Sequence, residues 1–390
     1  MDLKHEVAVL KSELISLRRD FHMHPELGFE EHRTSGIVAS YLEKCGLEVT
    51  RMAKTGVVGL LKGASAGKTL LLRADMDALP VHEKTNLPYA SVYEGKMHAC
   101  GHDGHTAMLL VAAKVLSARK EELSGSIKFV FQPNEEDAGA YLMIEEGVME
   151  NPKVDAAVGG HLWSGLDTGT IDIYEGPVMA ASHYFYLTVI GVGGHAGNTA
   201  RAVDPIMISA NIIQAAQSMQ TREISALDPT AIVFTGIRAG SNPTTVPETV
   251  EMQGSIRFLA KDGTAVKEAF ERVIANTCAA YRADYNLTFR IGNEMVVNDP
   301  ALTELAREAA LECLGSDGEN KLTARHRSMG GEDFSEFITE VPGVFYFIGS
   351  GCSAKGTDYS HHHPCFNIDE DALLTGTEMH VRVALKYFNL

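Results

Sequence analysis

Apolar residues recur at three- and four-residue steps at the start of the chain: Val7, Leu10, Leu14, Leu17 and Phe21. This spacing places them on one face of a helix and predicts an amphipathic helix over 7–21. Short apolar runs typical of buried strands follow, starting at Val57, Thr69, Ser126 and Ala156. The stretches 106–116 and 138–146 between these runs predict helices. Alternating strands and helices indicate an α/β layer with many parallel neighbours.

A different pattern occupies the middle of the chain, between residues 181 and 294. The elements expected there are strand 184–192, helix 204–220, strands 231–238 and 249–259, helix 264–281 and strand 285–291. The order β-α-β-β-α-β is that of a ferredoxin-like module. A helix at 300–314, a strand at 344–350 and a helix at 369–387 then complete the first layer. We therefore predict a large domain of residues 1–180 plus 295–390, with a smaller domain inserted at 181–294.

The composition is that of a globular protein with a sizeable core. Of its 390 residues, 45% are hydrophobic and 22% are charged, and a chain of this length commonly forms two domains. The formal net charge of −17 argues against nucleic acid as a partner, because nucleic-acid binding requires a basic surface.

The opening segment and the cysteines bear on the location of the protein. The opening segment is charged throughout and does not resemble a signal peptide. No stretch approaches the roughly 18 apolar residues of a membrane helix. The six cysteines lie far apart, and we expect them to be reduced thiols. The sequence therefore predicts a cytoplasmic protein with no membrane partner.

The segment HACGHDGH at 98–105 carries the strongest chemical signal. Cys100 and His102 stand two residues apart, so in an extended segment both side chains would project from one side toward one metal ion. Thiolate and imidazole are good ligands for zinc and other first-row metals. A buried cysteine in a polar loop is the ordinary alternative. Several ligand types in one short glycine-rich segment favour a metal site.

A pair of acids, Glu135 and Glu136, follows the apolar run that starts at Ser126. Functional groups gather at the carboxyl ends of parallel strands. One carboxylate there could bind a metal while its neighbour carries a proton. An isolated pair of glutamates is more often a solvated surface, so the pair gains weight only together with the other residues.

Further potential ligands stand at other predicted strand ends and loops. His161 ends one apolar run, and three adjacent histidines occupy 361–363. Asp75 and Asp77 end another run. They could orient metal ligands through hydrogen bonds without binding the metal themselves, although Asp77 could equally cap a turn. Each of these residues alone has a structural explanation, the lone histidine above all. Together, soft and hard ligands on one layer suit zinc, manganese or cobalt better than calcium or magnesium.

Seven motifs occur in one order along the chain: RADMDALP, HACGHDGH, FQPNEE, GGHLW, GGHAG, GGEDF and HHPCF. With them the chain resembles the amidohydrolase branch of the aminoacylase/carboxypeptidase-G-like metallopeptidases, which includes hippurate, auxin-conjugate and aminobenzoyl-glutamate hydrolases. The opening RRDFHMHPELGFEEHRT is similar to that branch too. The resemblance covers almost the whole chain. It implies an α/β fold in which a large mixed-sheet di-metal hydrolase domain carries an inserted ferredoxin-like dimerisation or lid domain.

The resemblance also implies the chemistry. Two divalent metal ions (zinc, manganese or cobalt) would bind in the large domain, and Glu135 would act as general base and acid in cleaving a small N-acyl amino acid or similar amide. Asp77 falls on a residue that supports the metal site. Among the late histidines, His362 matches, because the family ligand stands two residues before a proline. The implied metal ligands are Cys100, His102, Glu136, His161 and His362.

The inserted domain carries two residues that the resemblance marks as functional. His195, in GVGGHAG, falls on a histidine that helps to hold the substrate carbonyl, often across a dimer. Without the resemblance it would be a turn histidine beside glycines. Arg257, in GSIR, matches a position that can bind a substrate carboxylate, although an arginine in a strand is otherwise often just exposed. The family implies a homodimer, or a larger assembly, formed through this domain.

Three departures from the family lie near substrate-contacting positions. Residues 198–201 follow HAG where many members have a proline and often a histidine. Thr244 replaces the asparagine of a common Asn-Val-Ile-Pro, and residues 137–140 replace a glycine-rich run. Because the metal set is intact, these departures bear on the choice of substrate rather than on hydrolysis.

Three other functions remain open on the sequence. A dipeptidase or short-peptide peptidase would use the same site. A binding protein that has lost catalysis would keep the fold, but the intact Glu135 and ligand set argue against it. A cysteine hydrolase would use Cys100 with a nearby histidine, and its activity would resist a chelator.

Overall fold

The computed structural model describes residues 3–259 and 263–390. They divide into two compact units. The first runs up to Val178 and includes Val296–Arg327 and Asp333–Leu390. The second comprises Met179–Met295 together with Ser328–Glu332. That last short segment rejoins the second unit although no pattern in the sequence indicated it.

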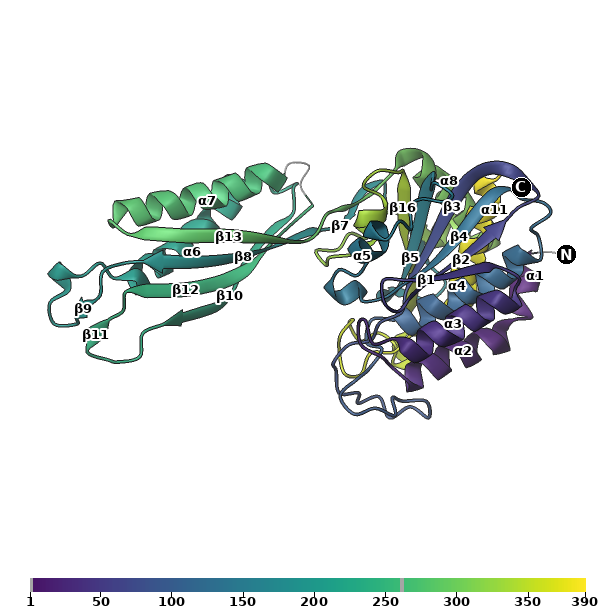
Figure 1. The fold of residues 1–390 in the computed structure, drawn as a ribbon, viewed down its shortest axis with the longest axis horizontal. Coiled ribbons are helices and arrows are strands. Elements are labelled where there is room, and N and C mark those ends of the chain that lie inside the picture. Colours follow the sequence, from purple (N-terminus) through teal and green to yellow (C-terminus); the bar gives the residue numbers. More distant parts are fainter. Residues whose placement is uncertain (1–2, 260–262) are drawn as a thin grey trace. The chain divides into compact units, whose positions relative to one another are not determined.

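A mixed sheet forms the centre of the first unit. Its strands lie in the order β1 (Glu48–Met52), β2 (Gly56–Lys62), β4 (Ser124–Gln132), β3 (Ser65–Asp75), β5 (Ala156–Asp167), β16 (Gly343–Gly351), β6 (Ile171–Asp172) and β15 (Leu322–Thr323). Figure 1 labels the strands from β1 to β16 in this order and leaves β6 and β15 without labels. Neighbours from β4 through β3 and β5 to β16 run parallel, whereas β1 and β2 join antiparallel at one edge. Two further strands, β7 (Gly176–Met179) and β14 (Val296–Asn298), pair separately.

The central strands were visible in the sequence because they are covered on both faces. Every residue of β16 is buried, as are the second half of β3 and most of β5. Parallel strands buried on both faces read as near-continuous apolar runs. The predicted runs at Thr69 and Ala156 therefore mark β3 and β5, although β3 begins earlier and β5 ends later than the apolar letters do.

Helices pack on this sheet and on one another. Figure 1 shows α2 (Lys11–Met23), α3 (His32–Lys44) and α4 (His102–Ser117) side by side. Helix α11 (Ala372–Tyr387) packs against both α4 and α8 (Pro300–Leu314). The other α-helices in the described part of the first unit are α1 (Leu3–Ala8), α5 (Ala140–Glu145), α9 (Gly318–Lys321) and α10 (Phe334–Phe337). Nearly every residue of α4 is buried, so this helix is central to the core.

The single opening helix predicted over 7–21 is wrong, because the chain forms two helices there. The N–H of Leu10 bonds to the carbonyl of Val7, three residues back, at 3.0 Å. This tighter bond ends α1, and α2 begins at Lys11. The predicted apolar face is nevertheless right, since Val7 and Phe21 are both buried in the same core.

The second unit has its main elements in the order strand, helix, strand, strand, helix, strand, as expected for a ferredoxin-like module. They are β8 (Ala181–Ile190), α6 (Pro205–Arg222), β10 (Thr230–Ala239), β12 (Thr249–Phe258), α7 (Gly263–Ala280) and β13 (Asp284–Asn293). The four strands form an antiparallel sheet in the order β10-β12-β8-β13. Two short strands, β9 (Gly194–His195) and β11 (Thr245–Val246), form a separate antiparallel pair.

One face of this antiparallel sheet is buried under α6 and α7. Phe185 of β8, Ile212 of α6 and Phe270 of α7 belong to one hydrophobic core. Helix α6 begins where the sequence indicated, since the Asp204 carboxylate accepts the N–H of Ile206 at 2.9 Å. Along β12, buried residues alternate with exposed or half-buried ones, so the other face of the sheet is open. That face carries polar side chains and some apolar ones.

Two general expectations concern thiols and membranes. All six cysteines lie in the described part of the chain and are free thiols. Among the helices of residues 3–259 and 263–390, none has the length and apolar character needed to cross a membrane.

Candidate metal centre

Cys100 and His102 are brought together by a sharp turn into α4. Gly101 between them has a φ of 97°, a left-handed conformation that glycine adopts readily. His102 is the first residue of α4, so the two side chains do not project from an extended segment and that geometric reason was wrong. They nevertheless converge, because ligand atoms of Cys100, His102 and His161 all lie within 4.8 Å of one another.

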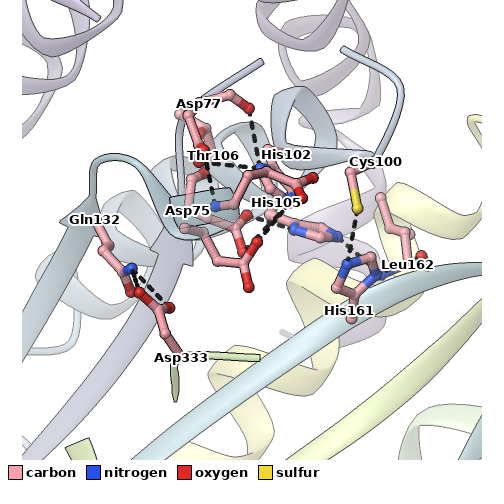
Figure 2. Close-up of polar contacts among 12 residues, drawn as sticks. Asp75, Asp77, Cys100, His102, His105, Thr106, Gln132, His161, Leu162 and Asp333 are labelled. Atoms are coloured by element: carbon pink, nitrogen blue, oxygen red, sulfur yellow. Dashed lines mark hydrogen bonds and ion pairs between the residues drawn. The ribbon is translucent and has the colours of Figure 1, made fainter. Parts of the chain in front are cut away.

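His161 reaches this group from β5, as Figure 2 shows. Its Nε2 lies 3.6 Å from the Cys100 sulfur, and its Nδ1 donates to the carbonyl of Leu162 at 2.7 Å. Because a carbonyl can only accept, Nδ1 carries the proton and Nε2 has the free lone pair. Burial and the neighbouring histidines hold the pKa of His161 well below its ordinary value. The ring is therefore neutral, as a metal ligand must be.

A second group contains Cys100, Glu136 and His362, whose ligand atoms also lie within 4.8 Å of one another. His362 Nε2 is 3.2 Å from Glu136 Oε1. The backbone N–H of His362 donates to the Ala99 carbonyl at 2.8 Å, which ties this late loop to the Cys100 segment. Hydrogen bonds to Cys100 and Glu136 raise the pKa of His362 to about 10. The two groups share the thiol of Cys100.

Glu135 and Glu136 lie in one turn of 3-10 helix, Glu135–Asp137, directly after β4. The Glu135 side chain is 10% exposed, with Oε2 3.9 Å from His102 Nε2. Ligand atoms of His102, Glu135 and Glu136 fall within 4.8 Å of one another. The two glutamates therefore face the potential metal ligands and are not part of a solvated surface.

Asp77 holds two of these side chains in place. One carboxylate oxygen lies 3.2 Å from His102 Nδ1, and the other accepts the backbone N–H of Glu136 at 3.1 Å. The Asp77 carbonyl oxygen is also 3.0 Å from His102 Nδ1, so that nitrogen carries the proton. Within the described residues, His102 Nε2 is buried and makes no hydrogen bond. A buried imidazole nitrogen left over beside a thiol and two carboxylates fits a metal ion.

The protonation of His102 follows from its surroundings. Burial disfavours the imidazolium, but Asp75 and Cys100 outweigh it and raise the pKa of His102 well above its ordinary value. Burial also raises the pKa of the Cys100 thiol. Without an ion, the Cys100 sulfur and the His102 ring therefore keep their protons, and a metal ion that bound there would displace them.

His105 is a contributor that sequence reasoning did not identify. Its Nδ1 donates to Asp75 at 2.6 Å, and its Nε2 accepts the N–H of Leu162 at 2.9 Å (Figure 2). Pairing between β3 and β5 ends at Arg73 and Gly159. Beyond that point β3 offers no carbonyl to the backbone N–H of Leu162, and His105 accepts its hydrogen bond instead. The i, i+3 spacing of His102 and His105 at the start of a helix could have indicated a shared role.

A buried polar network lies behind Asp75. Arg73, with a side chain 1% exposed, donates to Asp75 at 2.6 Å and to Asp333 at 3.0 Å. Gln132 also donates to Asp333, at 2.7 and 2.8 Å (Figure 2). Asp333 accepts the N–H of Ala140 at 2.9 Å, which anchors the chain just beyond the turn with the two glutamates. The motifs RADMD and GGEDF thus meet in one network.

The two residues predicted in the inserted segment belong to the second unit, whereas Cys100 belongs to the first. His195 is exposed on β9 opposite Thr245, and its Nδ1 accepts the N–H of Gly197 at 3.0 Å. Arg257, on β12, donates to the carbonyl of Met329 at 3.1 Å.

Comparison with known proteins places this geometry in a family. The model of peptidase family M20/M25/M40 matches residues 71–386. Thermostable carboxypeptidase 1 of Saccharolobus solfataricus is 38% identical, with 99% of this chain and 98% of that protein aligned. N-acetylcysteine deacetylase of Bacillus subtilis is also 38% identical, over 95% of this chain and 96% of its own.

The crystal structure of a dinuclear metal-binding peptidase of the M20 family from Bacillus subtilis has the same fold. It superimposes with a TM-score of 0.85 at 34% identity, covering 98% of this chain and 99% of that one. The match extends through the segments that carry the grouped thiol, imidazole and carboxylate atoms. This chain therefore belongs to peptidase family M20/M25/M40, and its resemblance to the metallo-amidohydrolases of that family is confirmed.

Proposed function

We propose that this enzyme is a metal-dependent amidohydrolase acting on small N-acyl amino acids, with Glu135 as its general base and acid. The observation that carries the proposal is the convergence of two ligand groups on one shared thiol, with Glu135 against them. The deacetylase among its relatives supports the N-acyl class of substrate. The proposed metal ligands are Cys100, His102, Glu136, His161 and His362.

Two divalent ions held there would lower the pKa of a water molecule and polarise the amide carbonyl. Glu135 accepts the proton from the attacking water and passes it to the nitrogen of the leaving amine. Asp77 fixes the ring of His102 and the backbone of Glu136 before substrate arrives. A thiolate combined with imidazole and carboxylate supports zinc, manganese or cobalt.

The second unit supplies the remaining proposed contacts. His195 would bind the substrate carbonyl and Arg257 a substrate carboxylate, within a homodimer formed through this unit. Exposed apolar side chains on the open face of its sheet, Tyr186 and Val233, support an interface there. The free thiols support a reducing, cytoplasmic location.

The test uses purified protein, chelated and then reloaded separately with zinc, manganese or cobalt. Wild-type enzyme is expected to hydrolyse at least one member of a panel of N-acetyl and N-benzoyl amino acids. Glu135→Gln should lower turnover by about 10²–10⁴-fold while keeping its metal, measured by elemental analysis. Glu121→Gln, which changes an acid with a side chain 80% exposed, is the control and should match wild type.

Two results would overturn the proposal. If Glu135→Gln kept most of the activity, Glu135 would not be the general base and acid. If wild-type enzyme hydrolysed no amide in the presence of metal, the proposed amidohydrolase function would be wrong.

A peptidase for short peptides is the second candidate, because a carboxypeptidase is among the relatives. Dipeptides with a free amine, assayed beside the N-acyl panel, separate the two functions. A cysteine hydrolase is disfavoured because burial raises the pKa of Cys100 and so opposes a nucleophilic thiolate in the absence of metal. Activity that resists chelation would reverse that judgement.

A further inference from the structure

Glu31, in the opening motif ELGFEE, is a fully buried carboxylate with no part in the chemistry proposed above. One of its carboxylate oxygens accepts the backbone N–H of Asn134 at 2.9 Å. The other accepts the hydroxyl of Thr55 at 2.6 Å. Because Asn134 directly precedes Glu135, Glu31 binds the backbone next to the proposed general base.

The turn that presents Glu135 depends on an unusual backbone at Asn134. Asn134 has a φ of 53° and Ala138 a φ of 61°, so left-handed residues flank the turn on both sides. The Asn134 carbonyl accepts the N–H of Gly139 at 2.7 Å, which closes the turn on itself. Such non-glycine conformations cost on the order of 1–3 kcal/mol and persist only where their surroundings hold them. Glu31 is one of the groups that hold Asn134.

The segment around Glu31 is packed closely against this turn. A Cβ on Gly28 would lie 1.7 Å from Oδ1 of Asn134, so only glycine lets the two segments approach as they do. The N–H of Ala78 donates to the Glu26 carbonyl at 2.8 Å. Residues 26–31 therefore contact both the turn after β3, where Asp77 lies, and the turn after β4.

Thr55 fixes Glu31 from the other side. It lies between β1 and β2 and is buried. Next to it, the Lys54 ammonium lies 4.1 Å from the centre of the Phe29 ring, which ties the same connection to the Glu31 segment. The carboxylate of Glu31 is thus held at one oxygen while it holds Asn134 with the other.

We propose that Glu31 is a positioning residue for Glu135, fixing the amide of Asn134 and hence the direction in which the next side chain points. The inference rests on the proposed role of Glu135. A hydrogen bond from an amide to a carboxylate is among the stronger ones in proteins. A misplacement of about 1 Å at a reacting group can lower a rate by roughly 10²-fold.

The test compares two replacements of Glu31 with a neighbouring control. Glu31→Met keeps the length of the side chain but removes both acceptors, whereas Glu31→Gln keeps one. We expect Glu31→Met to lower kcat by about 10–100-fold with KM and metal content unchanged, and Glu31→Gln to recover most of kcat. Glu30→Met, which changes an adjacent acid 60% exposed at its side chain, should behave as wild type.

A second measurement does not depend on turnover. In metal-free protein, hydrogen–deuterium exchange of the Asn134 amide should be about ten-fold faster in Glu31→Met than in wild type or Glu30→Met. If Glu31→Met does not fold, Thr55→Val removes the hydroxyl that orients Glu31 and keeps its shape. It should give faster exchange and a smaller loss of kcat.

The outcomes separate this inference from the proposed function. Unchanged exchange at Asn134 overturns the contact on which the inference depends, whatever the enzyme does. Faster exchange with unchanged kcat, in an enzyme that Glu135→Gln inactivates, overturns the positioning role alone. Wild-type protein that hydrolyses no amide overturns the proposed function, and with it the meaning of Glu31 for catalysis.

Discussion

At the residue scale, Cys100 is the side chain on which both ligand groups depend. Its sulfur lies within 4.8 Å of ligand atoms from His102 and His161, and equally from Glu136 and His362. Because burial raises the pKa of this thiol, binding of an ion must displace a proton from it. Cys100→Ala is therefore expected to lower the metal content, measured by elemental analysis, below that of wild type, and to lower activity with it.

The control for this prediction is a second thiol of the same unit. Cys352 is partly buried and belongs to neither ligand group, so Cys352→Ala should keep the wild-type metal content. Equal metal content in Cys100→Ala and Cys352→Ala would contradict the shared role of Cys100.

The three adjacent histidines show where residue-level reasoning stops. Spacing alone could not choose among them, and the resemblance chose His362. In the structure, His361 Nε2 is 3.0 Å from the Leu162 carbonyl and His363 stacks on Tyr359 with ring centres 4.8 Å apart. His362 has a left-handed backbone, with a φ of 66°, which directs its side chain to Glu136. That choice depends on the local backbone, which residue types do not encode individually.

Residues that support the site were harder to find than its proposed ligands. Strand ends marked Asp77, Glu135, Glu136 and His161, because apolar runs stop where functional groups begin. The sequence marked Glu31 only as part of a family motif and gave no sign of its contact with Asn134. The two residues are 103 positions apart in the chain. A buried hydrogen bond between distant segments leaves no periodic trace in either one.

At the element scale, burial explains which elements were predictable. Strands covered on both faces gave the runs that identified β3, β4, β5 and β16. The strands β6 and β15 have two residues each and were missed, because so short a segment carries no pattern. The return of Ser328–Glu332 to the second unit was missed for the same reason.

Lys128 gives a prediction about the interior of the large sheet. Its ammonium, on β4, donates to the carbonyls of Val148 and Glu150 at 2.8 and 2.6 Å. Burial lowers its pKa from 10.5 to about 8. Between these values the unfolded chain binds more protons at this site than the folded one. The free energy of unfolding, relative to Lys128→Met, should therefore rise with pH across that window, by at most about 1.4 kcal/mol per unit.

Urea denaturation of both proteins, below pH 8 and at two points inside the window, measures this difference. Cysteines and tyrosines titrate in both proteins, so their contributions to the free energy of unfolding largely cancel in the difference. A difference that stays flat or falls from the lower to the upper pH would show that Lys128 keeps its ordinary pKa in the folded protein.

At the scale of the whole molecule, the two units have separate hydrophobic cores. The core of the first unit includes α4 and β5 residues such as Leu109 and Val158. That of the second unit includes α6 and α7 residues such as Ile212 and Phe270. The proposed metal ligands all belong to the first unit. Metal binding should consequently stabilise one core and leave the other almost unaffected.

This asymmetry can be tested by removing and restoring the metal. The proposed ligands range from Cys100 to His362, so a bound ion links segments far apart in the sequence. Metal at about 100 times its Kd stabilises a folded state by roughly 2.7 kcal/mol. Hydrogen–deuterium exchange in α4 and β5 should therefore slow when metal is restored to chelated protein, whereas exchange in α6 and α7 should not. Equal slowing in both units, or none in α4, would contradict a metal centre confined to the first unit.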